Sequence, residues 1–236
     1  MKAQDNPVSL EAKEFLQSAD FVDSNSREVQ EFVARAFDGL ADAASDTEKT
    51  ICLFNAVRDG LRYDPYQISL TPDAYRASVI AKGSSAYCVP KAILLTACLR
   101  AAGIPAALGF ADVRNHLNTP KLSELMGTDL FIYHGYVQVW LEGKSYKITP
   151  AFNMELCERF GVKPLEFDGT SDALFHEFNE QDERHMEYEN DRGVFLDVPI
   201  EQFLSDFRAA YPNMVSHIEA GEVQNTKDAF TEDVQK

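Results

Sequence analysis

Residues 83–105 constrain the fold of this chain more than any other segment. Between Lys91 and Arg100 there is no charged side chain, and the apolar residues recur at spacings of three and four, which is the periodicity of a helix. Pro90 fits the first turn of a helix, because the amide that proline lacks would have no partner inside the helix there. The segment therefore predicts a helix that is buried on most sides, with Cys88 at its N-terminus.

Cys88 is the candidate nucleophile. Unpaired amides and the positive end of the helix dipole gather at a helix N-terminus, where they favour thiolate over thiol and lower the pKa of a cysteine. The same amides can stabilise the oxyanion that forms when a thiolate attacks a carbonyl. The alternative interpretation is a small buried apolar residue. The other three cysteines lie in apolar or amphipathic patterns, without zinc-site spacing, and are interpreted as core: Cys52, Cys98 and Cys157.

The composition excludes several classes of function. The 236 residues carry a formal net charge of −16, which argues against nucleic acid or an anionic membrane as the main partner. No apolar run approaches the length of a membrane span, and the N-terminal residues lack the apolar core of a signal peptide. We therefore expect a cytoplasmic protein that binds neither nucleic acid nor membranes. The sequence does not determine its oligomeric state.

The order of the predicted elements indicates an α+β fold. Helical patterns come first, at 8–18, 26–40, 47–61, 72–82 and 90–102. An antiparallel sheet follows, with strands at 106–113, 131–141 and 145–149, and later helices are predicted at 154–161 and 201–210. We expect a single domain over 1–236, divided into an N-terminal helical part (8–45), a catalytic core (46–155), a C-terminal appendage (156–212) and a tail (213–236).

His134 is the candidate base for Cys88. It shares the more polar face of its strand with Tyr136 and Trp140, whereas Gly135 and the apolar residues that alternate with it are expected to face the core. A thiolate–imidazolium pair keeps a cysteine ionised and later supplies a proton to the leaving group. A lone histidine on a strand is more often a structural residue. The context of Cys88 favours the catalytic interpretation.

The hairpin after His134 places two candidates for orienting its ring. A tight turn at residues 142–143 sets Tyr136 opposite Thr149, which then lies diagonal to His134 on the same face. A hydroxyl can orient an imidazole but cannot stabilise imidazolium as a carboxylate does. Asn153, just beyond Pro150, is the other candidate.

Together these motifs resemble the transglutaminase-like superfamily, a papain-like group of cysteine enzymes, and in particular its bacterial branch of uncharacterised proteins. The resemblance runs from about residue 50 to 200 and rests on Gly83, Cys88–Ala92, Leu99–Pro105, Tyr133–Gly135, Gly143, Thr149–Asn153, Glu166–Gly169 and His185–Tyr188. It implies a core of helices packed on an antiparallel sheet, with the nucleophilic cysteine at a helix N-terminus and a histidine and an aspartate on neighbouring strands. The sequence departs from this pattern in two places. Thr149 stands where the aspartate is usual, and Ala107 stands where an arginine is common.

These observations predict a thiol enzyme that hydrolyses an amide or peptide bond, or transfers its acyl group, through a thioester on Cys88. His134 would move the proton, and Thr149 or Asn153 would orient it. The expected partner is a peptide, a protein or a small amide, with no cofactor and no metal. The alternative is a catalytically idle module that binds a peptide or protein and keeps the fold.

Two further groups of side chains leave alternatives open. Asp112, Arg114 and His116 alternate along one strand, and they either line the same cleft or form a solvated strand end. A metal site built from His176, His185 and nearby acids is conceivable, but their spacing matches no known metal motif.

Overall fold

The computed structural model describes residues 10–115, 119–174, 186–222 and 230. Its helices are α1 (Leu10–Glu14), α2 (Arg27–Ala36), α3 (Asp46–Gly60), the short 3-10 helix η1 (Pro72–Tyr75), α4 (Ala77–Ile80), α5 (Cys88–Ala101), α6 (Pro120–Met126), α7 (Met154–Phe160), α8 (Ile200–Ala210) and α9 (Pro212–Glu219). Its strands are β1 (Arg62–Tyr63), β2 (Ser85–Ala86), β3 (Ala106–Asn115), β4 (Leu130–Leu141), β5 (Lys144–Ile148) and β6 (Met186–Phe195). None of the described helices has the length and apolar character that a membrane span requires.

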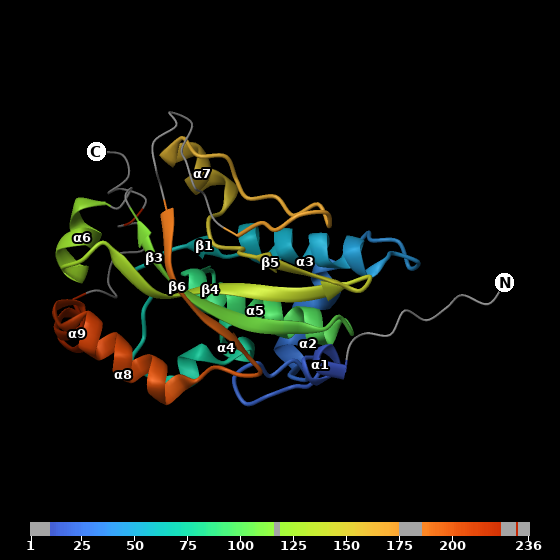
Figure 1. Ribbon diagram of the computed structural model, residues 1–236, viewed down its shortest axis with the longest axis horizontal. Helices are drawn as coiled ribbons and strands as arrows, with labels where there is room; N and C mark the ends of the chain where they lie inside the picture. Colours follow the sequence, from blue (N-terminus) through green and yellow to red (C-terminus); the bar gives the residue numbers. More distant parts are fainter. Residues whose placement is uncertain (1–9, 116–118, 175–185, 223–229, 231–236) are drawn as a thin grey trace.

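Helix α5 is the centre of the molecule, as its sequence predicts. It begins at Cys88, and every side chain from Cys88 to Arg100 is buried. Helices α2, α3 and α4 pack on one side of it, and strands β3 and β4 pack on the other (Figure 1). Such a helix must be apolar all round, which explains the run without charges.

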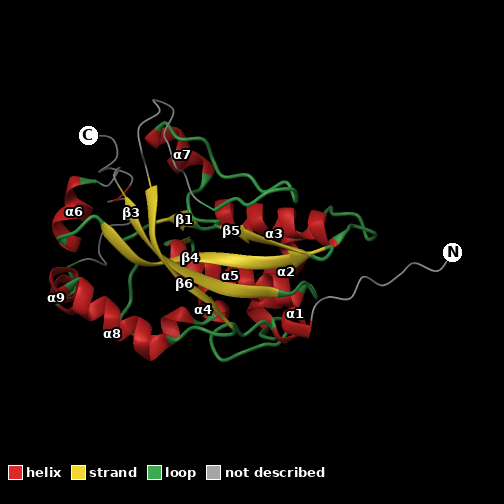
Figure 2. Ribbon diagram, viewed as in Figure 1, coloured by secondary structure: helices red, strands yellow, loops and turns green. Residues whose placement is uncertain are grey.

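The main sheet has the strand order β5-β4-β3-β6, and its pairs are antiparallel (Figure 2). The expected α+β arrangement, with helices packed on an antiparallel sheet, is therefore confirmed. Strand β6 was not predicted, because acidic residues interrupt the alternation of apolar side chains there. Its edge position beside β3 accounts for this polarity, since one of its sides faces solvent.

The hairpin between β4 and β5 has the predicted register. Val137 lies opposite Ile148 and Trp140 lies opposite Ser145. The turn residues Glu142 and Gly143 both have positive φ values, 50° and 79°, as a two-residue hairpin turn of the I′ type requires.

Local signals also fix several helix ends. The Ser45 hydroxyl accepts a hydrogen bond from the Glu48 backbone amide, and the Glu48 carboxylate accepts one from the Ser45 backbone amide. Helix α3 therefore begins with a capping box. Helix α9 was not predicted, because polarity rises after Tyr211. It is nevertheless amphipathic, with Met214 and Ile218 buried one turn apart.

Candidate active site

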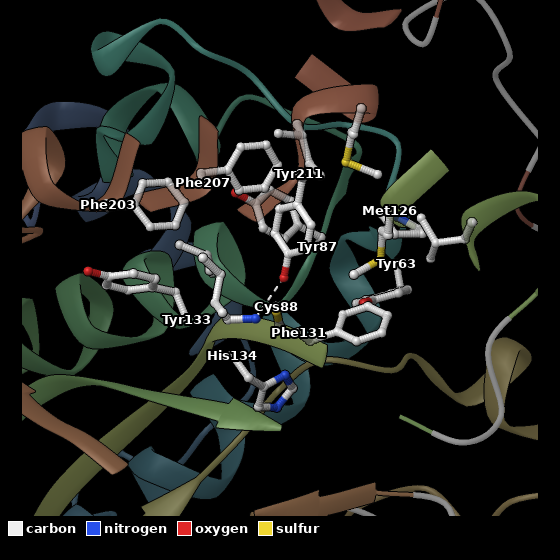
Figure 3. A pocket seen from close by; sticks show the side chains of 16 residues that line it. Tyr63, Tyr87, Cys88, Met126, Phe131, Tyr133, His134, Phe203, Phe207 and Tyr211 are labelled. Carbon is white, nitrogen blue, oxygen red and sulfur yellow. Dashed lines mark hydrogen bonds between the residues drawn. The ribbon is translucent and has the colours of Figure 1, made fainter. Parts of the chain in front are cut away.

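Cys88 and His134 line one pocket, at the place where the N-terminus of α5 meets β4 (Figure 3). The remaining walls are formed by aromatic and aliphatic side chains and include Tyr63, Tyr87 and Tyr211. Its volume of about 40 Å³ has room for a few water molecules rather than for a bulky group. The residues predicted as nucleophile and base therefore both contribute to the lining of one small, largely apolar pocket.

Gly135 allows the close approach of α5 and β4. A Cβ atom at this position would lie 3.0 Å from both the carbonyl oxygen of Cys88 and the Cα atom of Val89. Any larger residue would therefore push the N-terminus of the helix away from the strand. The contact also brings the Gly135 backbone close enough to the Cys88 thiol to oppose the rise of its pKa.

Burial decides the protonation of Cys88. Its side chain has little solvent contact, and this burial raises the pKa of the thiol to about 11. Backbone amides of Gly135, Val89 and Cys88 itself oppose the rise, but they do not outweigh it. The sequence predicted a lowered pKa from the helix N-terminus, and this expectation is wrong for the closed pocket. The resting side chain is a neutral thiol.

His134 lies on the face of the sheet that points away from α5. Gly135 and Val137 face the helix, as predicted, whereas Tyr136 belongs to a small separate cluster on the other face. In Figure 3 the imidazole is drawn across the β4 ribbon from the labelled tyrosine rings. No hydrogen bond joins the Cys88 and His134 side chains in the part of the chain that the structure describes.

Thr149 and Asn153, the two orienting candidates, are both buried but differ in their contacts. Thr149 lines a second, smaller cavity together with His134, and its hydroxyl has no hydrogen-bond partner among the described residues. The side-chain oxygen of Asn153 instead accepts a hydrogen bond of 3.0 Å from the backbone amide of Tyr63. Thr149 is therefore the candidate that shares a cavity with His134.

A β-bulge precedes His134, and an ionic network holds it. Ile132 and Tyr133 together lie opposite Asp112, and Tyr133 has a φ of 58°. The Asp112 carboxylate accepts hydrogen bonds from the Tyr133 amide, at 3.1 Å, and from Nε of Arg192, at 2.6 Å. The guanidinium of Arg192 also lies 4.1 Å from the centre of the Tyr133 ring.

The ionic network at the β-bulge shows that neither of the two interpretations of Asp112 is correct. Asp112 is neither a solvated strand end nor one of the residues that line the Cys88 pocket. It supports the backbone next to His134. Arg192 had no sequence signal, because its strand was not predicted.

Lys91 is the other residue whose role was missed. It lies one turn after Cys88, its side chain is fully buried, and burial lowers its pKa to about 7. Its Nζ donates hydrogen bonds of 2.6–2.8 Å to the carbonyl oxygens of Arg58, Leu61 and Ala151. The signal in the sequence was a lysine at the start of a helix that carries no other charged side chain before Arg100.

The described residues include no cluster of three or more histidine, cysteine or acidic side chains that could hold a metal ion. The histidines considered for such a site, His176 and His185, lie outside the described residues, as does His116. The four cysteines are free thiols.

Half of the chain, to within one residue, matches the model of a known protein family. The family model described as the transglutaminase-like superfamily matches residues 33–149. Residues 33–149 belong to this superfamily. The matched segment runs from α2 to the end of β5, so the transglutaminase-like part contains Cys88, His134 and Thr149, whereas Asn153 lies just beyond it.

Two solved structures are similar to parts of this chain at low sequence identity. A candidate cysteine protease from Cytophaga hutchinsonii is 15% identical, with a TM-score of 0.45, over 61% of this chain and 43% of that protein. A candidate protease from Parabacteroides distasonis is 18% identical, with a TM-score of 0.36, over 62% of this chain and 30% of that protein. The chain thus spans less than half of either protein. No curated protein matches it.

Proposed function

We propose that this transglutaminase-like chain is a thiol enzyme that acts on an amide or peptide bond through a thioester on Cys88. The observation that carries the proposal is that Cys88 and His134 both line one pocket, at the start of a buried helix. A helix N-terminus supplies amide donors for an oxyanion, and a neighbouring imidazole supplies a base. The free cysteines support a reducing compartment such as the cytoplasm.

The raised pKa of Cys88 sets the order of the chemical steps. His134 takes the thiol proton while the sulfur attacks the carbonyl carbon, so that the S–C bond forms as the S–H bond breaks. The backbone amide of Cys88 donates to the oxyanion. His134 then gives the proton to the leaving amine as the C–N bond breaks, and a thioester remains.

The second half of the reaction releases the acyl group. Water attacks the thioester in a hydrolase, and a second amine attacks it in a transferase; either nucleophile gives a proton to His134 and the thiol is restored. Thr149 is the better supported of the two residues that could orient His134, because both line the same cavity and the Asn153 oxygen is engaged by Tyr63. Catalytic hydrogen bonds often tighten only when substrate binds, which fits the absence of a direct hydrogen bond between Cys88 and His134.

The proposal is tested by acylation with p-nitrophenyl acetate at pH 7.5, followed by release of p-nitrophenolate and by intact mass. The full chain should become acetylated at Cys88, and Cys88→Ala should remove this adduct. His134→Ala should slow the reaction by about 100-fold, which is the usual contribution of a general base. Added glycinamide separates the two acceptors, because only a transferase forms the acetylated amine in preference to acetate.

The alternative function is a catalytically idle module that binds a peptide or protein in the same place. Two observations favour it, namely the raised pKa of Cys88 and the threonine at position 149 in place of a carboxylate. It predicts that Cys88 reacts with the ester no faster in the full chain than in His134→Ala. That result would leave binding as the function of the fold.

A further inference from the structure

An aromatic side chain from the C-terminal part of the chain fills a socket beside the candidate nucleophile. The ring of Phe230 lies 5.8 Å from that of Tyr63, 6.0 Å from that of Tyr66 and 5.9 Å from that of Phe160, measured between ring centres. Phe230 is only 5% exposed. We call the rings of Tyr63, Tyr66, Phe152 and Phe160 the aromatic socket.

Three of the four rings of the aromatic socket contact one another independently of Phe230. The Tyr63 ring meets the Phe152 ring edge-on at 4.7 Å, and Phe152 stacks on Phe160 at 5.9 Å. The Tyr63 backbone is fixed by the hydrogen bond from its amide to Asn153 and by pairing with Ala86 in the small parallel sheet. The socket is thus built from segments that precede Cys88 and follow His134 in the sequence.

The aromatic socket adjoins the pocket of Cys88. Tyr63 belongs to both, since its ring contacts Phe230 and it also lines the pocket that contains Cys88 and His134. A peptide that placed an aromatic side chain in the socket would therefore contact Tyr63, a residue that also lines the Cys88 pocket. Edge-to-face contacts between rings recognise an aromatic side chain in preference to an aliphatic one.

We propose that the aromatic socket is the subsite for an aromatic side chain of a peptide substrate, and that Phe230 occupies it in the resting chain as an internal competitor. This inference rests on the proposed function, because it assigns a substrate class to the proposed active site at Cys88. An intramolecular competitor acts at an effective concentration in the millimolar range, so an external peptide binds only weakly until Phe230 is displaced or removed.

The test is a binding measurement, which does not depend on catalysis. A fluorescein-labelled peptide with the sequence of residues 226–234, Thr-Lys-Asp-Ala-Phe-Thr-Glu-Asp-Val, is titrated with the full chain and with Phe230→Ala, and anisotropy is recorded. The Phe230→Ala chain should bind the peptide at least tenfold more tightly than the unchanged chain. The same peptide with alanine in place of phenylalanine should bind Phe230→Ala at least tenfold more weakly.

Three further variants complete the experiment. Phe230→Leu, which keeps an apolar side chain and so protects the fold, should give an intermediate affinity. Leu196→Ala removes an exposed apolar side chain outside the socket and should bind like the unchanged chain. Cys88→Ala, made together with Phe230→Ala, should bind as tightly as Phe230→Ala alone. Failure of the thiol chemistry would therefore leave these affinities intact.

Two outcomes would overturn the inference. One is equal affinity of the peptide for the unchanged chain and for Phe230→Ala, which would mean that Phe230 does not compete. The other is equal binding of the phenylalanine and alanine peptides to Phe230→Ala, which would mean that the socket does not recognise the ring.

Discussion

The ammonium group of Lys91 donates a hydrogen bond of 2.6 Å to the carbonyl oxygen of Ala151. This contact ties the helix that begins at Cys88 to the segment between the two orienting candidates, Thr149 and Asn153. The same ammonium reaches two carbonyl oxygens at the end of α3 and just after it. One buried charge thus joins three segments around the site.

Lys91→Met should change how stability depends on pH. Burial lowers the pKa of Lys91 from 10.5 to about 7 in the folded chain. Between these two pH values the unfolded chain holds a proton that the folded chain has released. The free energy of unfolding therefore gains a term that rises with pH across this window, by at most about 1.4 kcal/mol per pH unit, and that is lost as the pH falls toward 7. Urea titrations from pH 6 to 10 should show this term in the unchanged chain and not in the variant.

At pH 8, Lys91→Met should also lower stability by about 3 kcal/mol, since three buried carbonyl oxygens lose their donor. The matched control is Lys49→Met, which removes a partly exposed lysine whose ion pair with Asp46 is at the surface. The control should change stability by less than about 1 kcal/mol. Equal effects of the two variants would contradict a structural role for the buried ammonium.

Gly135→Ala should separate the helix of Cys88 from strand β4. The added methyl group would lie 3.0 Å from backbone atoms of Cys88 and Val89, neither of which can move without moving the helix. We expect a loss of about 1–3 kcal/mol in thermal unfolding and a slower reaction of Cys88 with p-nitrophenyl acetate. Gly60→Ala is the control, because nothing lies within 4 Å of its added methyl group. A Gly135→Ala chain as stable and reactive as the control would show that the close approach is not needed.

Cys88 should react slowly with iodoacetamide near neutral pH. Because burial raises its pKa to about 11, the thiolate fraction should increase about tenfold per pH unit from pH 7 to 10, instead of levelling off near 8.5. Mass spectrometry of the alkylated tryptic peptide measures the rate for this cysteine alone. A plateau reached by pH 8 would mean that the helix amides dominate over burial after all.

The sequence predicted those parts of the fold and site that depend on local chemistry. Pro90 and the uncharged run after Lys91 were enough to place the start of the buried helix, and Gly143 was enough to set the hairpin register. The sign of the Cys88 pKa shift depends instead on how completely distant aromatic side chains exclude water, which no local pattern reveals. The bulge at Tyr133 likewise depends on the carboxylate of Asp112 from a neighbouring strand. Such contacts become visible only when the strands are paired.

Asp112→Asn should weaken the bulge next to His134. The neutral side-chain amide of asparagine cannot form an ion pair with Arg192. Its oxygen can still accept the hydrogen bond from the Tyr133 backbone amide. We expect a loss of about 1–2 kcal/mol and a slower ester reaction, while alkylation of Cys88 stays unchanged, because only the base is displaced. Asp129→Asn is the matched control, since its ion pair with Arg114 is half exposed, and it should cost less than about 1 kcal/mol. A parallel loss in ester reaction and alkylation would point to general unfolding rather than to the position of His134.

Thr149→Val tests whether the Thr149 hydroxyl contributes to the stability of the resting chain. The hydroxyl is buried without a hydrogen-bond partner among the described residues, so its replacement by a methyl group of similar size should leave the free energy of unfolding unchanged or raise it by up to about 1 kcal/mol. Thr96→Val provides the contrast, because the Thr96 hydroxyl donates a hydrogen bond of 2.8 Å to the carbonyl of Ala92, and its loss should cost about 1 kcal/mol. If Thr149→Val slows the ester reaction without lowering stability, Thr149 orients His134 only when substrate is bound. If it lowers stability as much as Thr96→Val, the hydroxyl already has a partner in the folded chain.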